Sequence, residues 1–310
     1  MGHIITDLKE AFRRGNVYIQ LIFINVGVFV ITTLIGILLQ LFTRSAAGIF
    51  ELLAVPASFT RFAWQPWSIF TYMFMHAGFL HILFNMLWLY WFGALFLYFF
   101  SGKHLRGLYI VGGICGGLLY MISYNVFPYF RPMTAYSTMV GASASVLAIV
   151  VATAYREPNY PVRLLFFGNV RLKYLALIVV LTDLLFITSS NAGGHIAHLG
   201  GALAGLWFAA SLNKGKDITS WVNKALDAIA ALFSAKTWKR KPKMKVHYGN
   251  NTRQNDYDYN ARKKAQSDEI DRILDKLKKS GYESLTTEEK KSLFDASKRS
   301  VSYTHLTLPT

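Results

Sequence analysis

The sequence predicts an all-α membrane protein in which six transmembrane helices precede a short helical cytoplasmic C-terminal module. The chain of 310 residues is 53% hydrophobic and has a formal net charge of +16, and ordinary soluble domains rarely combine so many hydrophobic residues with so high a net charge. The two properties separate along the chain, since residues 1–213 hold nearly all the long apolar runs and residues 214–310 are rich in charged side chains. A spanning helix needs roughly 20 mainly apolar residues. Six segments qualify or nearly qualify: about 17–42, 77–99, 106–127, 138–155, 172–189 and 194–212.

Lysine and arginine in the short loops predict the orientation, because cytoplasmic loops carry an excess of both. Basic residues are frequent before the first apolar segment, after the second and after the fourth. The alternate loops carry Arg44, Arg61 and Arg131. Residues 1–16 are therefore expected to form a cytoplasmic N-terminus, residues 17–213 a six-helix membrane domain, and the C-terminal part a second cytoplasmic region.

Polar side chains gather in the segments that enter from the outer side. His81 and Asn85 lie four residues apart on one face, early in the second segment. Ser143 lies in the opening turns of the fourth segment, and His195 and His198 lie in those of the sixth. At about 1.5 Å rise per residue, all of them fall in the outer half of the bilayer. Polar groups are costly there and by default mark a functional interior.

Small residues recur every three or four positions in the fourth and sixth segments, a pattern that lets helix backbones approach closely. They are Gly141, Ala144, Ala148 and Ala152 in the fourth, and Ala197, Gly201 and Gly205 in the sixth. If these faces pack together, Ser143 and His198 come within hydrogen-bond reach. A serine hydroxyl becomes a nucleophile when a neighbouring base takes its proton, and a neutral imidazole is such a base. The alternative is that Ser143 is a small packing residue and that His198 bonds a backbone carbonyl.

His81, Asn85 and the backbone N–H of Ser143 are candidate donors to an oxyanion. Acyl transfer needs hydrogen-bond donors aimed at the negative charge that develops on the carbonyl oxygen. The alternative for His81 and Asn85 is a polar contact between helices.

Three motifs resemble, in order and spacing, the rhomboid family of intramembrane serine proteases. They are His81-x-x-x-Asn85, Gly141-Ala142-Ser143-Ala144 and Ala197-His198-Leu199-Gly200-Gly201-x-x-x-Gly205, and the run from Trp67 to His76 resembles the first loop of the family. The resemblance covers about residues 15–212 and implies a six-helix rhomboid-like bundle.

The same resemblance implies a Ser-His dyad, with Ser143 as nucleophile and His198 as general base, and an oxyanion site that uses His81 and Asn85. It selects His198 over His195, because the histidine of the family follows an alanine; His195 is expected at the mouth of the site or in solvent. The implied substrates are transmembrane helices, cut near the outer membrane face. His76 is expected to support the first loop.

The chain departs from the family pattern at three positions. Ala144 stands where glycine usually follows the nucleophile, so that its methyl group is expected next to the oxyanion site. Ser68 follows Trp67 where arginine is usual, and Arg61 is a candidate to supply the missing loop anchor. Leu147 stands where an aromatic residue often stacks on the histidine.

Two rival functions are kept open. An inactive rhomboid-like chaperone or adaptor would bind helices without cutting them, although such relatives usually lose a catalytic residue. A metal transporter or metalloprotease would use histidines, which are His76, His81, His195 and His198. Zinc sites often add a carboxylate or thiolate, and we identify almost none at this depth and no catalytic side chain in the fifth segment. We therefore expect no metal and no cofactor.

Residues 214–266 are expected to hold an amphipathic helix at about 218–233, a basic juxtamembrane cluster and a disordered linker over 248–266. The helix lies on the inner surface or continues the sixth span. The basic cluster favours anionic lipid over nucleic acid as partner, because it directly follows the membrane domain. Its members are Lys236, Lys239, Arg240, Lys241, Lys243 and Lys245.

Residues 267–300 are expected to form a small helical module for docking or regulation. A first helix is predicted over 268–279, and Thr286 or Thr287 with Glu288 and Glu289 is predicted to cap a second. The module resembles one found on some rhomboids of Bacteroidetes-type bacteria, which places the protein in a bacterial inner membrane. Residues 301–310 resemble translated vector sequence and are expected to be a non-native tail.

Overall fold

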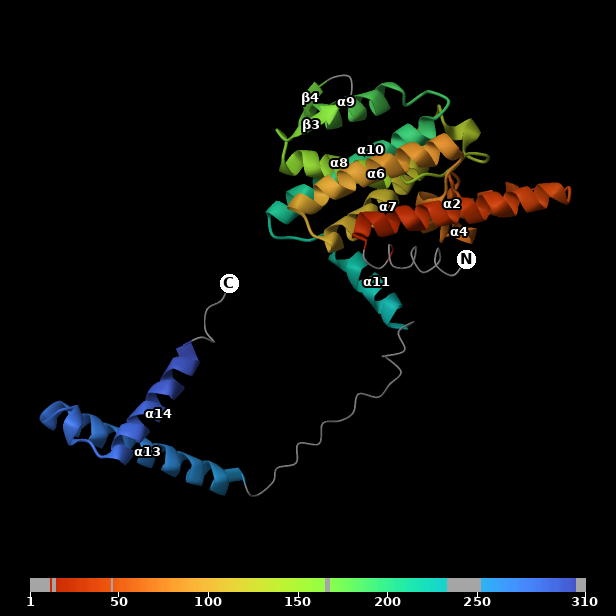
Figure 1. Ribbon diagram of the computed structural model, residues 1–310. Coiled ribbons are helices and arrows are strands. Elements are labelled where there is room, and N and C mark those ends of the chain that lie inside the picture. Colours follow the sequence, from red (N-terminus) through yellow and green to blue (C-terminus); the bar gives the residue numbers. More distant parts are fainter. Residues whose placement is uncertain (1–11, 13–14, 46, 165–167, 233–251, 305–310) are drawn as a thin grey trace. The chain divides into compact units, whose positions relative to one another are not determined.

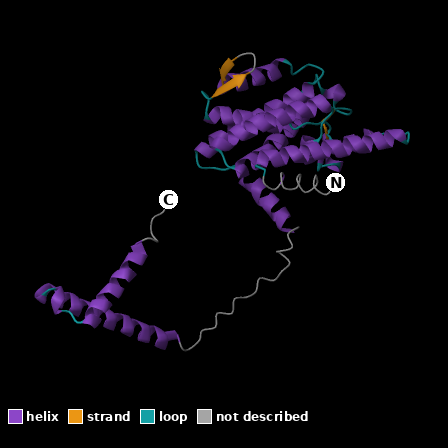
Figure 2. Ribbon diagram, viewed as in Figure 1, coloured by secondary structure: helices purple, strands orange, loops and turns teal. Residues whose placement is uncertain are grey.

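The computed structural model describes residue 12 and residues 15–45, 47–164, 168–232 and 252–304. The chain divides into two compact units, residues 1–238 and 239–310. Regular structure in the described residues is almost entirely helical, with two short two-stranded sheets (Figure 2).

Four helices among the described residues are long and apolar enough to cross a membrane, so the chain is a multi-pass membrane protein. They are α2 (Val17–Leu41), α6 (Phe79–Phe99), α7 (Gly102–Val126) and α10 (Ala192–Asn213). Helices α8 (Ser143–Arg156) and α9 (Leu172–Leu185) have 14 residues each. At 1.5 Å per residue that is about 21 Å, less than the roughly 30 Å of a hydrocarbon core. Six spans remain a prediction.

Helix α8 begins five residues later than predicted, at Ser143 itself. Thr138–Met139 form strand β2, which pairs antiparallel with β1 (Val55–Pro56). Gly141 then adopts a φ of 141°, which no helix allows. Helix α9 also ends before the predicted boundary, at Leu185 instead of about 189. The nucleophile candidate therefore stands at a helix N-terminus and not within a helix.

The small residues predicted to face one another do so. Helices α7, α8 and α10 pack against one another, and α9 packs against both α8 and α10 (Figure 1). A Cβ atom on Gly201 would overlap the carbonyl oxygen of Ala144, and one on Gly205 would overlap that of Ala148. On the other side of α10, a Cβ on Gly200 would lie 2.6 Å from the carbonyl oxygen of Cys115 in α7. The three backbones meet only because side chains are absent at these positions.

The segment between α2 and α6 is folded into short helices. These are α3 (Ala47–Leu53), α4 (Phe59–Trp64), α5 (Ser68–Thr71) and the 3₁₀ turn η1 (Tyr72–Phe74). Trp67 Nε1 donates to the carbonyl of Leu52 at 3.0 Å, and Thr71 Oγ1 donates to that of Leu53 at 2.7 Å. Arg61 forms an ion pair with Glu51 at 2.7 Å. Arg61 thus binds within this loop, in agreement with its expected anchoring role.

Two of the loops between the helices contain regular structure that the sequence analysis did not predict. A hairpin of β3 (Pro161–Leu164) and β4 (Gly168–Arg171) joins α8 to α9, and the 3₁₀ turn η2 (Arg131–Met133) follows α7. Helix α11 (Ser220–Leu232) is separate from α10, because a turn at Gly215 with φ 75° divides them. It docks on α7, where Arg106 donates to Asn223 at 3.0 Å.

The second unit contains α13 (Thr252–Ser280), the 3₁₀ turn η3 (Tyr282–Ser284) and α14 (Thr287–Thr304). The predicted disordered linker is wrong from residue 252 onward, since α13 begins there. Alanine, arginine, lysine and glutamine, which favour helix, make up eight of the 15 residues at 252–266. The basic cluster at 236–245 lies outside the described residues. Helix α14 runs four residues into the segment predicted to be a non-native tail, whose origin stays a prediction.

Candidate active site

Ser143 is the first residue of α8 and is held in place by the loop before it. The N–H of Gly141 donates to the carbonyl of Tyr72 at 2.9 Å. The hydroxyl of Tyr72 in turn donates to the carbonyl of Gly113 in α7 at 2.5 Å. Together with the β1–β2 pairing, these bonds tie the approach to Ser143 to the first loop and to α7. The Ser143 side chain is half-buried.

His81 and Ser143 both lie close to Gly141. A Cβ atom on Gly141 would stand 3.0 Å from His81 Nε2 and 3.5 Å from Ser143 Oγ. The N–H of Ala77 donates to His81 Nδ1 at 3.3 Å. In a neutral imidazole one nitrogen accepts and the other carries the hydrogen, so this bond leaves Nε2–H as the donor that faces Gly141.

Ser143, His198 and Asn85 line one cavity of about 200 Å³. Its other lining residues are apolar: Phe84, Trp88, Val146, Leu147 and Val179. Asn85 is buried and donates one amide N–H to the carbonyl of His81 at 2.8 Å. Its second amide N–H remains for another acceptor. The structure therefore brings together three of the four predicted site residues in the cavity, with His81 at Gly141 beside them.

Asp183 of α9 is a functional candidate that the sequence analysis missed. Its Oδ1 lies 2.8 Å from Nδ1 of His198 and 2.8 Å from Nδ1 of His195. Asp183 is a carboxylate at the depth where almost none was expected, and it lies in the fifth segment, where the sequence analysis identified no catalytic side chain. Asp183 is the only acidic residue in the apolar run 174–189. An ionisable group in such a run is itself the signal that could have identified it.

The two other histidines differ from one another in their surroundings. His195 is not simply solvated at the mouth, because it bonds Asp183 and its side chain is only 19% exposed. His76 precedes α6, and its ring lies 5.2 Å from that of His81. Burial, and then the neighbouring His81, lower the pKa of His76 to about 4. His76 is therefore neutral at physiological pH.

Two of the three departures from the family pattern, Ala144 and Leu147, lie in α8. The third, Ser68, is buried, and its hydroxyl has no hydrogen-bond partner among the described groups. The methyl group of Ala144 faces α7, since a Cβ on Gly116 would lie 2.6 Å from it, and Ala144 does not line the cavity. Leu147 takes a place in the cavity wall beside Ser143 and His198. The methyl group that could crowd the oxyanion site points instead into the interface between α8 and α7.

Asp183, His195 and His198 also offer one ligand atom each within 4.8 Å of one another. Two histidines and a carboxylate are a donor set that Zn²⁺ accepts. The carboxylate that the metal hypothesis lacked in the sequence is therefore present in the fold.

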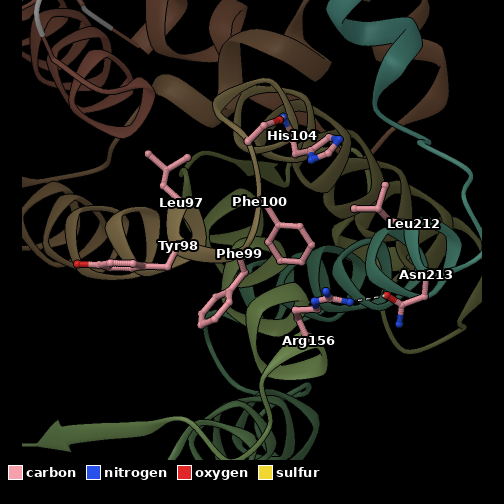
Figure 3. Close-up of a pocket in the computed structure, with 9 residues that line it drawn as sticks. Leu97, Tyr98, Phe99, Phe100, His104, Arg156, Leu212 and Asn213 are labelled. Atoms are coloured by element: carbon pink, nitrogen blue, oxygen red, sulfur yellow. Dashed lines mark hydrogen bonds between the residues drawn. The ribbon is translucent and has the colours of Figure 1, made fainter. Parts of the chain in front are cut away.

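A larger cavity, of about 540 Å³, lies at the far end of α8 (Figure 3). Arg156 donates to Asn213 at 3.2 Å there, and the aromatic residues Phe99 and Phe100 stand beside them. Arg156 ends α8 and lies about 20 Å along the helix from Ser143 at 1.5 Å per residue. This cavity contains none of the predicted catalytic residues.

Comparison with known proteins agrees with the motifs. Residues 63–214 match the family described as rhomboid domain. The chain carries a rhomboid domain. Residues 254–299 match a family of unknown function, DUF6576, which covers much of α13 and α14. Over 158 residues the chain is 29% identical to the RHOMBOID-like protein 12, mitochondrial, of Arabidopsis thaliana. This alignment covers 48% of the chain and 47% of the plant protein, so the chain spans about half the length of this relative.

Proposed function

We propose that the protein is an intramembrane serine protease that cleaves transmembrane helices near the outer membrane face. The observation that carries this proposal is the shared cavity of Ser143 and His198, with Asn85 in its wall. A serine needed only for packing and a histidine with only a structural role would not be expected to line the same cavity.

In the proposed reaction Ser143 Oγ attacks the scissile carbonyl carbon while its proton moves to His198 Nε2. The tetrahedral intermediate then collapses, the C–N bond breaks, and His198 returns the proton to the leaving amine. Water repeats the sequence on the acyl-enzyme, with His198 first accepting and then donating a proton.

The oxyanion would be stabilised from two directions. His81 Nε2–H faces Gly141, and Asn85 keeps one amide N–H for a further acceptor. Helix α8 begins at Ser143 without a side-chain cap, whereas α7 is capped by Ser101. Its first backbone N–H groups and the positive end of its dipole therefore remain for a negative charge.

The cavity walls support an apolar substrate. Phe84 and Trp88 of α6 face Val146 of α8 and Val179 of α9 across it. A volume of about 200 Å³ holds one side chain rather than a folded helix, so a substrate helix must unwind locally before it is cut.

The orientation of the protein in the membrane is inferred from charge. We propose that both termini are cytoplasmic, because basic residues accumulate in alternate loops. The resemblance of the C-terminal module to one found on bacterial rhomboids supports a bacterial inner membrane as the location. The second unit would serve docking or regulation, and the basic cluster at 236–245 would contact anionic lipid.

The decisive experiment is cleavage of a helix-destabilised transmembrane substrate by the protein in liposomes. Ser143→Ala and His198→Ala are expected to reduce cleavage to the uncatalysed level. Ser145→Ala is the matched control, since Ser145 is fully buried, has no hydrogen-bond partner among the described groups and does not line the cavity. If Ser143→Ala cleaves as well as wild type, the protease mechanism is wrong. If wild type binds the substrate without cutting it, the chaperone or adaptor function replaces it.

A further inference from the structure

The geometry points to Asp183 as a positioning residue for His198, one that fixes the histidine tautomer required of the general base. This inference rests on the proposed function, because it assigns the base of that reaction its orientation. It extends the Ser143–His198 pair to a third polar group, on α9, which also contributes Val179 to the cavity wall.

The hydrogen-bond geometry dictates the tautomer. Oδ1 of Asp183 lies 2.8 Å from His198 Nδ1, a hydrogen-bond distance. A carboxylate oxygen only accepts, so His198 must place its hydrogen on Nδ1. In the neutral ring the lone pair is then on Nε2, the nitrogen that remains to take the proton of Ser143. The opposite tautomer would present an N–H to the serine and could not act as a base.

The burial of Asp183 supports a role beyond packing. The Asp183 side chain is 5% exposed and stands in an apolar helix, where an ionisable group is costly. Oδ1 is satisfied by two imidazole groups, while Oδ2 has no hydrogen-bond partner among the described groups. An apolar side chain of similar size would fill the same space without the free-energy cost of burying an ionisable group.

His195 is the second donor to the same oxygen, at 2.8 Å. It lies one turn before His198 in α10 and does not line the cavity. Its bond holds the carboxylate in place from a residue outside the cavity. When His198 takes the serine proton, the positive charge forms next to Asp183, as in the Ser-His-Asp arrangement of soluble serine hydrolases.

A metal ion bound by these three residues would have a different geometry and effect. Ligand atoms about 2.0–2.1 Å from a tetrahedral zinc lie about 3.3 Å apart, whereas both nitrogens here lie 2.8 Å from Oδ1. A metal on His198 Nδ1 would also leave the hydrogen on Nε2 and remove the base. The distances therefore favour direct hydrogen bonds.

The test compares Asp183→Asn with His195→Gln in the full-length protein, using the cleavage assay in liposomes. Asp183→Asn keeps the shape but can offer an N–H to His198 Nδ1, which favours the wrong tautomer. We expect kcat to fall about 10²–10⁴-fold with KM within about twofold. His195→Gln keeps an N–H donor for Asp183 and is expected to retain kcat within about tenfold. Asp183→Glu, which restores the acceptor, is expected to regain part of the rate.

Nitrogen NMR of ¹⁵N-histidine-labelled protein reads the tautomer without any need for activity. His198, assigned by loss of its signals in His198→Ala, is expected to show a protonated Nδ1 in wild type and in Ser143→Ala. This signature is expected to disappear in Asp183→Asn. If wild type does not cleave but the signature is present, the proposed function fails and the positioning role of Asp183 stands.

Three results would overturn the inference. One is unchanged kcat in Asp183→Asn, and another is an equal loss of kcat and melting temperature in Asp183→Asn and His195→Gln, which marks a purely structural role. The third is stoichiometric zinc in the purified protein that Asp183→Asn abolishes, with activity lost on chelation.

Discussion

Gly201 of α10 lies directly against the carbonyl oxygen of Ala144, the residue that follows Ser143 in α8. A Cβ atom on Gly201 would overlap this oxygen, and the contact is repeated one turn further along between Gly205 and Ala148. The distance between α10 and α8 at the candidate site is thus set by the absence of a side chain. Because His198 is three residues from Gly201 on the same helix, this contact also fixes where the imidazole stands relative to Ser143.

Gly201→Ala is expected to push α10 away from α8. The added methyl has no space beside a backbone carbonyl, so we expect a loss of about 1–3 kcal/mol of stability. A displacement of about 1 Å between base and nucleophile would lower kcat about 10²-fold. Thermal unfolding in detergent and the cleavage assay measure the two effects.

Gly27→Ala is the control for this variant. Gly27 also lies in a spanning helix, and a Cβ there would meet nothing within 4 Å. We expect unchanged cleavage and a stability equal to or slightly above wild type, since alanine favours helix. Equal losses in both variants would show that the contact with Ala144 does not set the site.

The sequence sufficed for the parts of the fold that depend on local pattern. Apolar runs located the long helices, and the spacing of small residues identified the faces of α8 and α10 that meet. These faces carry Ser143 and His198, and both residues line the cavity found in the structure.

The remaining parts depend on contacts between distant segments. The start of α8 follows from the pairing of residues 138–139 with 55–56, which no local pattern shows. Asp183 was missed because α9 was judged on its apolar average, although one buried carboxylate outweighs that average. The linker prediction failed because a polar sequence was equated with disorder, while α13 forms helix from residue 252.

Gly141→Ala is expected to inactivate the protein beyond its effect on stability. Gly141 has a φ of 141°, and a Cβ would stand 3.0 Å from His81 Nε2. Backbone strain costs about 1–3 kcal/mol, and displacement of the His81 donor lowers kcat about 10²-fold. Gly215→Ala shares a positive φ of 75° but meets nothing within 4 Å, so it should lose stability alone. The cleavage rate of each variant is normalised to the folded fraction measured by circular dichroism. Similar normalised rates in Gly141→Ala and Gly215→Ala would show that His81 is not part of the oxyanion site.

Asn223 is expected to hold α11 on α7 more firmly than Asp227 does. Asn223 is buried, accepts from Arg106 and donates to the carbonyls of Lys103 and Thr219. Asp227 meets Arg106 at 3.0 Å, but its side chain is 56% exposed. Asn223→Ala is expected to cost about 1–3 kcal/mol, and Asp227→Ala at most about 1 kcal/mol.

Hydrogen exchange of the α11 amides measures this difference. We expect faster exchange in Asn223→Ala than in Asp227→Ala, with cleavage unchanged in both because α11 lies away from Ser143. Equal exchange in the two variants would mean that another contact docks the helix.

The N-terminus of α14 is expected to loosen in acid. The Thr286 N–H donates to Glu289 Oε2 at 2.8 Å, and the Glu289 N–H donates to Thr286 Oγ1 at 3.3 Å, which forms the predicted cap. The backbone bond from Thr286, followed by Lys276, lowers the pKa of Glu289 below its ordinary value of 4.5. A carboxyl group with a lowered pKa stabilises the folded state fully when the pH is above its ordinary pKa, and this contribution is lost as the pH falls through its folded-state pKa.

Amide exchange in the first turn of α14, corrected for the intrinsic rate, should therefore accelerate below about pH 4.5. Glu289→Gln is expected to remove this pH dependence, and Glu288→Gln, at an exposed neighbour, to keep it. If exchange in Glu289→Gln still accelerates in acid, a titratable group other than Glu289 causes the acid sensitivity.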